Sequence, residues 1–65
     1  MGASILRLPE VIKITGLSRS AIYDQIAAGR FPKQIKLTSR SSGWVESEVS
    51  SWLDSLIAKR DSEAA

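Results

Sequence analysis

The chain has 65 residues, of which 43% are hydrophobic and 25% charged, and it contains neither cysteine nor histidine. This length accommodates a single domain, residues 1–65, with order expected over about residues 5–60 and a small core. The absence of both residue types excludes disulfides and makes a structural zinc site untenable, so we expect no metal and no cofactor.

The sequence also argues against an enzyme and against a membrane protein. It has no histidine or cysteine to act as base or nucleophile, and no glycine-rich phosphate loop. Its apolar runs are far shorter than the roughly 20 residues that span a bilayer. The segment Met1–Leu8 lacks the apolar stretch of a signal peptide. We therefore expect a non-enzymatic, cytoplasmic protein.

The charge is unevenly distributed along the chain, although the net charge is only +2. Residues 1–43 carry seven basic and two acidic side chains, whereas residues 44–65 carry two basic and five acidic ones. Such asymmetry is typical of a protein with one face for a polyanion. The alternative is an ordinary solvated surface, and charge by itself does not decide between the two.

A first short helix is predicted after Ile5 and Leu6. Pro9 suits the first helical position, where its missing N–H is not needed. Glu10 in the first turn favours the helix dipole, and Gly16 suits the C-terminal cap. The helix is therefore expected to end at a tight turn.

A second short helix follows at once. Ser18 is expected to cap it by accepting a hydrogen bond from the backbone N–H of Ser20 or Ala21. Ile22 and Ile26 mark its buried side, and Gly29 its end. Two helices joined by the turn Thr15–Leu17 form the outline of a helix-turn-helix.

A small hairpin is predicted next. Ile35 and Leu37 fall on one face of a strand and Lys36 on the other. Thr38–Ser42 is expected to turn the chain, and Gly43–Val45 to return as the second strand. The hairpin would carry a polar, basic tip.

The last element is an amphipathic helix. Ser47 is its expected N-cap, Lys59 and Arg60 lie in its expected last turn, and the tail 58–65 is expected to fray. We expect this helix to close the core beneath the first two, with an apolar stripe formed by Val49, Trp52, Leu53, Leu56 and Ile57.

This order of elements predicts a mainly α fold with a small β-hairpin, the winged helix-turn-helix. Several segments together resemble the AlpA family of small prophage- and genomic-island-encoded regulators, which are related in fold to MerR-type and excisionase DNA-binding domains. The resemblance covers roughly Leu6 to Ile57. It is carried by Leu8-Pro9-Glu10-Val11, Thr15-Gly16-Leu17-Ser18-Arg19-Ser20, Ile22-Tyr23, Gly29-Arg30-Phe31-Pro32, Gly43-Trp44, Glu48-Val49 and Trp52-Leu53.

The resemblance implies a transcriptional regulator that binds double-stranded DNA sequence-specifically and is nucleoid-associated. Some family members activate an integrase gene, whereas others are excisionases that bend attachment-site DNA and recruit integrase. An excisionase is thus the first alternative, and a protein-interaction module without DNA binding the second. Integrase and RNA polymerase are the implied protein partners.

The second helix of this motif enters the major groove with its N-terminal residues near the bases. We expect base or near-base contacts from Arg19, Ser20 and Tyr23, and a phosphate site at the cap Ser18. Arg19 is alternatively a solvated charge, and Tyr23 alternatively a packing residue. A step of about 100° per residue, with Ile22 buried, turns the following outward: Ser20, Tyr23, Asp24 and Ala27.

Asp24 departs from this pattern, because phosphates repel a carboxylate on the DNA-facing side. It either avoids the backbone, accepts from a cytosine amino group, or orients Arg19 or Arg30.

The hairpin is the second expected contact, lying along phosphates or in the minor groove. It is alternatively an ordinary flexible tip. Trp44 and Trp52 are assigned to the core rather than to base stacking. The expected contact residues are Lys33, Lys36, Thr38, Ser39, Arg40, Ser41 and Ser42.

So small a domain would cover under about 1,000 Å² of its own surface on DNA. Because that footprint limits specificity, we expect cooperative self-association on repeated sites.

Overall fold

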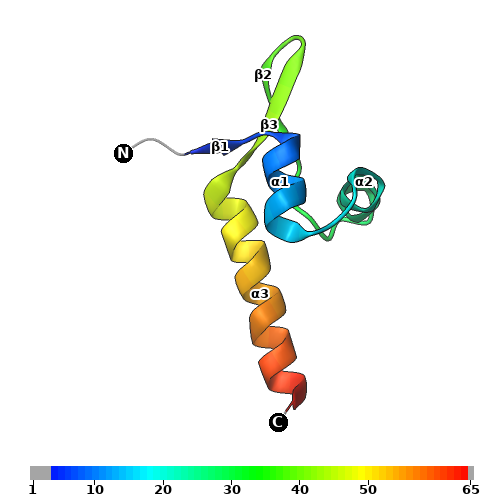
Figure 1. Ribbon diagram of the computed structural model, residues 1–65, viewed down its shortest axis with the longest axis vertical. Helices are drawn as coiled ribbons and strands as arrows, with labels where there is room; N and C mark the ends of the chain where they lie inside the picture. Colours follow the sequence, from blue (N-terminus) through cyan, green and yellow to red (C-terminus); the bar gives the residue numbers. More distant parts are fainter. Residues whose placement is uncertain (1–3, 65) are drawn as a thin grey trace.

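A computed structural model describes residues 4–64 of the chain (Figure 1). Those parts of the domain and tail predictions that concern residues 1–3 and 65 lie outside the described residues. The elements are β1 (Ile5–Leu6), α1 (Leu8–Thr15), α2 (Arg19–Ala27), β2 (Ile35–Thr38), β3 (Ser41–Val45) and α3 (Glu46–Ala64). The prediction of a mainly helical winged helix-turn-helix is confirmed. Among residues 4–64, no helix is both long and apolar enough to cross a membrane.

The sheet has three strands in the order β1-β3-β2, with both pairings antiparallel. The sequence predicted only the β2–β3 hairpin. Strand β1 pairs Ile5 with Val45 and Leu6 with Trp44. A further bond, from the Glu46 N–H to the Ser4 carbonyl (2.8 Å), continues this pairing. A two-residue strand is too short to show the alternating pattern from which strands are predicted. Strand β1 forms by pairing with β3, a partner far along the chain.

Helix α1 begins one residue earlier than predicted, with Leu8 first and Pro9 second. Proline is tolerated there because the first-turn N–H groups have no intrahelical acceptor. The Glu10 carboxylate accepts from the backbone N–H of Arg7 (2.9 Å), which fixes the helix start. Gly16 has φ +73° and donates its N–H to the Ile12 carbonyl (2.8 Å), as its cap assignment predicted.

Helix α2 follows after a three-residue turn. The Ser18 hydroxyl accepts from the Ala21 N–H (3.1 Å), which confirms the predicted cap. Ile22 is fully buried, and Ile26 is half-buried against the core. The helix ends at Ala28 as its C-cap, and Gly29 follows in the left-handed conformation (φ +73°).

The core lies between the helices and one face of the sheet. Both tryptophans are packing residues, as predicted. The Trp44 indole N–H donates to the Pro32 carbonyl (3.0 Å) and that of Trp52 to the Arg30 carbonyl (2.6 Å). These bonds hold the segment between α2 and β2 against β3 and α3. The buried side chains are Leu6, Val11, Ile22, Phe31, Trp44 and Val49.

The hairpin turn is tighter than predicted. Only Ser39 and Arg40 form the turn, so the expected loop Thr38–Ser42 is wrong: Thr38 ends β2, and Ser41 and Ser42 begin β3. The hydroxyls of Thr38 and Ser41 are hydrogen-bonded across the strands (2.8 Å), and Thr38 Oγ1 accepts from the Arg40 N–H (3.2 Å). These side-chain bonds close the two-residue turn. A register shift between Lys36 and Thr38 marks a bulge in β2.

Helix α3 differs from its prediction at both ends. It begins at Glu46 directly after β3, so Ser47 lies inside the first turn and is not the N-cap. It continues to Ala64, so residues 58–64 are helical rather than frayed. Lys59 and Arg60 consequently lie before the last turn, which carries no basic residue.

The apolar stripe of α3 is covered only near its beginning. Val49 is buried and Trp52 packs against the core, but Leu56 and Ile57 are 46% and 47% exposed. Figure 1 shows α3 running away from α1 and α2 toward the C-terminus. The prediction that α3 closes the core is therefore right for its first two turns and wrong for the rest.

Candidate nucleic-acid interface

Helix α2 presents one face to solvent along its length. The predicted outward residues Ser20, Asp24 and Ala27 are exposed, and Tyr23 is 37% exposed. Ile22, on the opposite side, anchors the helix in the core. The helical period of the sequence therefore predicted the orientation of α2 correctly.

Arg19 opens α2 and is exposed. Its guanidinium carbon lies 6.0 Å from the centre of the Tyr23 ring, at the outer limit of a cation–π contact. Within residues 4–64 the Arg19 guanidinium forms no ion pair, so its N–H donors are available to a ligand.

Tyr23 packs against Trp44 and is also partly exposed to solvent. Its ring meets the Trp44 indole edge to face, with centroids 6.4 Å apart and an interplanar angle of 61°. The packing interpretation and the contact interpretation of this residue are thus compatible, since the ring is held by β3 while part of it stays exposed.

Lys36 lies on the same side of the sheet as α2. It pairs with Ser42, and Ser42 is two residues from Trp44, so their side chains share one face of β3. Trp44 is the residue that Tyr23 contacts on that face. The basic residue of β2 and the outward face of α2 are thereby brought to a common side of the molecule.

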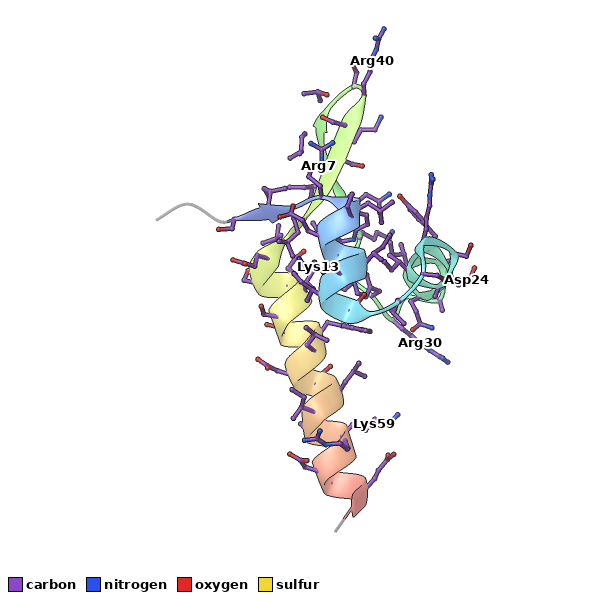
Figure 2. All side chains as sticks on the ribbon, in the orientation of Figure 1. Arg7, Lys13, Asp24, Arg30, Arg40 and Lys59 are labelled. Carbon is purple, nitrogen blue, oxygen red and sulfur yellow. The ribbon has the colours of Figure 1, made fainter. Side chains whose placement is uncertain are left out.

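The β2–β3 hairpin is the wing of this fold. Arg40 occupies its tip, far from the body of the protein (Figure 2). Ser39 beside it is also exposed. The hydroxyls of Thr38 and Ser41 are hydrogen-bonded to one another, and Ser42 is half-buried. Among the wing residues predicted to contact DNA, Lys36, Ser39 and Arg40 are therefore the most available.

Lys33 is placed apart from this group. It is exposed, and it lines a shallow hollow together with Glu48 and Ser51 at the beginning of α3. A phosphate contact from Lys33 stays a prediction, and it would have to come from the flank of the domain.

Asp24 makes no ion pair in the described part of the chain, where the one ion pair joins Arg60 and Asp61 (2.9 Å). The structure thus does not show Asp24 orienting Arg19 or Arg30. The carboxylate is exposed on the outward face of α2 (Figure 2).

Arg7 is a basic residue outside the predicted set of DNA contacts. It is exposed, and it follows Leu6, which pairs with Trp44 of β3. Arg7 therefore sits at the base of the wing (Figure 2). No local signal could have placed it there, because that position depends on the unpredicted strand β1.

The family model described as prophage CP4-57 regulatory protein (AlpA) matches residues 4–57, from β1 through most of α3. The chain belongs to the AlpA family. Two individual proteins are also similar to this chain in sequence. The protein named DNA-binding transcriptional activator AlpA of Escherichia coli K12 is 44% identical over 55 residues, covering 75% of this chain and 79% of that protein.

Protein ORF88 of Enterobacteria phage P4, described as uncharacterized, is 47% identical over 55 residues. The match covers 85% of this chain and 62% of the phage protein. The chain thus spans less than two thirds of that relative. The family assignment agrees with the fold and with the elements that carried the resemblance.

The described residues contain no group of acidic, cysteine or histidine side chains that could hold a metal ion. The donors gathered at the candidate interface are instead guanidinium, ammonium, hydroxyl and backbone N–H groups. These are the groups that bind phosphate oxygens and base edges.

Proposed function

We propose that this AlpA-family protein is a transcriptional regulator that binds double-stranded DNA, with α2 in the major groove and the β2–β3 wing on the backbone or in the minor groove. The first residues of α2 reach base edges, and the wing fixes the position of the domain along the duplex.

One observation carries this proposal: the Tyr23–Trp44 contact joins the exposed face of α2 to the side of the sheet that bears Lys36. The helix and the wing can therefore approach one duplex together. Arg19 can bond guanine through two hydrogen bonds, worth about 1–3 kcal/mol of discrimination. The name of the E. coli relative supports the same function.

The base-edge contacts are assigned to Arg19, Ser20 and Tyr23. Lys36, Ser39 and Arg40 supply wing contacts, with Lys33 and the hydroxyls of Thr38, Ser41 and Ser42 at its margins. The free N–H groups beside the cap Ser18 supply a phosphate site.

The test is fluorescence anisotropy of a generic duplex across a salt series, with Arg19→Ala, Arg40→Ala and Lys59→Ala variants. If five basic groups neutralise phosphates, the slope of log affinity against log salt is roughly −4. We expect Arg40→Ala to weaken binding and to flatten this slope by about 1, Arg19→Ala to weaken binding, and Lys59→Ala on α3 to leave affinity and slope unchanged. Absence of salt-dependent binding would favour a protein-interaction module instead.

An excisionase uses the same surface, so DNA affinity does not separate the two functions. A regulator changes transcription from a promoter carrying its site without integrase, whereas an excisionase changes the yield of excision only with integrase. Integrase, RNA polymerase and further copies of the chain are the partners that these two assays would reveal. Cooperative loading on tandem sites is expected in both cases, because one domain covers little DNA.

A further inference from the structure

The side of the sheet facing away from α2 carries apolar side chains. Ile35 pairs with Gly43, and Ile5 pairs with Val45, two residues further along β3. Because alternate residues of a strand face opposite sides, all of them point away from the Trp44 face. Leu37 joins them, since its Cδ1 would lie 3.4 Å from a Cβ at position 43. We call Ile5, Ile35, Leu37 and Val45 the back patch.

The back patch is open to solvent along β2. Ile35 is 42% and Leu37 41% exposed, whereas Ile5 and Val45 are half-buried. Within residues 4–64, strand β2 is an edge strand of the sheet. Contiguous exposed apolar groups on a small domain mark a contact surface.

A shallow hollow adjoins the back patch at Ile35. Its walls come from the segment before β2 and from the first turns of α3, and they bring one basic and one acidic side chain to the same surface. Neither Lys33 nor Glu48 forms an ion pair within the described chain. The lining residues are Pro32, Lys33, Gln34, Ile35, Ser47, Glu48 and Ser51.

We infer that the back patch and its hollow bind a second copy of this chain around a two-fold axis. A two-fold contact must be self-complementary, because the same patch meets itself. The patch satisfies this requirement: its centre is apolar, and its rim holds one cation and one anion on opposite walls. Lys33 of each copy then faces Glu48 of the other, twice in the pair.

The size of the patch sets the strength of this contact. Four partly exposed apolar side chains bury less than the roughly 800 Å² per partner of a stable complex. The pair is consequently weak in free solution, with a dissociation constant of about 0.1–1 mM. It becomes populated where the local concentration is high.

The contact leaves Lys36 and Tyr23 free for DNA, because they lie on the other face of the sheet, and it occupies only Lys33 among the proposed DNA contacts. A pair therefore carries two copies of the candidate interface and gains affinity through effective concentration. This consequence rests on the proposed function, whereas the contact itself does not, and it is tested without DNA.

The test is sedimentation equilibrium of the full chain from about 10 µM to about 1 mM, the range in which a weak pair forms. We expect the average mass to rise toward twice that of the monomer. Leu37→Glu should hold the protein monomeric, and Ile35→Glu is the second variant should the first fail to fold by circular dichroism. Leu56→Glu is the matched control, because it charges an equally exposed apolar residue on α3.

Reversal of the rim charges provides the decisive arm. Glu48→Lys should abolish the association by setting Lys33 against a lysine of the second copy, and the double variant Lys33→Glu/Glu48→Lys should restore it. A wild-type chain that stays monomeric at about 1 mM overturns the inference. Equal loss in Leu56→Glu and Leu37→Glu, or no recovery in the double variant, overturns it as well.

Discussion

Tyr23 of α2 and Trp44 of β3 join helix α2 to the sheet, ring edge against ring face with the ring centroids 6.4 Å apart. Trp44 is itself fixed by burial and by its bond to the Pro32 carbonyl. Because Trp44 is fixed in the core, its contact with Tyr23 also holds the partly exposed Tyr23 ring in place on α2. The packing of Tyr23 and its proposed contact with DNA can be separated by substitution.

Tyr23→Phe keeps the edge-to-face contact and removes only the hydroxyl. We expect unfolding stability within about 0.5 kcal/mol of wild type, because the hydroxyl has no protein partner among the described hydrogen bonds, and weaker DNA binding. Tyr23→Ala should in addition destabilise the fold by about 1–2 kcal/mol through the lost aromatic contact. Urea unfolding and anisotropy measure the two effects separately. Equal DNA affinity for wild type and Tyr23→Phe would assign the residue to packing alone.

Gly43 should tolerate no side chain. A Cβ there would lie 2.5 Å from Cγ2 of Ile5 and 3.0 Å from the Leu6 carbonyl oxygen. The Ile5 side chain must move and the backbone of β1 must shift slightly to admit the methyl group, so we expect Gly43→Ala to lose about 1–3 kcal/mol in chemical unfolding.

Gly29→Ala is the comparison for Gly43. Gly29 has φ +73°, but a methyl group added there would meet open space. The substitution should therefore lower the free energy of unfolding only by the backbone strain, about 1 kcal/mol. A smaller loss at Gly43 than at Gly29 would contradict the close approach of β1 and β3.

The local features of the fold were readable from the sequence. Ser18 and Gly16 act through their own hydroxyl and their own backbone freedom, so their cap positions could be predicted from neighbouring residues. Ile22 was placed by helical period alone. The outward face of α2, which holds most of the candidate base contacts, followed from that one orientation.

The features that depend on distant partners were not readable. Strand β1 exists because Leu6 meets Trp44, almost forty residues away. The full stripe on α3 looked like core, yet only Val49 and Trp52 find partners, because the body ends before Leu56. The predicted wing turn was too long, because Thr38 and Ser41 were both expected in the loop. In the structure their hydrogen bond joins the ends of β2 and β3 and shortens the turn. The neighbourhood of Lys33 likewise depends on where α3 begins.

Asp24→Asn tests the negative charge on α2, the helix proposed to enter the major groove. The carboxylate is exposed and takes part in no ion pair within residues 4–64, so its removal leaves the fold intact. We expect the variant to bind a generic duplex several-fold more tightly, because one repulsion with phosphate is lost, about 0.5–1 kcal/mol. Weaker binding to every duplex would show instead that Asp24 positions another group.

The two ends of the α3 stripe should respond differently to truncation. Val49→Ala empties a fully enclosed site and should cost about 1–3 kcal/mol in urea unfolding. Leu56→Ala removes a side chain that is 46% exposed and should change stability by no more than about 0.5 kcal/mol. Both substitutions favour the helix through alanine, so helix propensity does not explain a difference between them. Comparable losses would mean that the distal half of α3 folds back onto the body, in conflict with the path it takes in Figure 1.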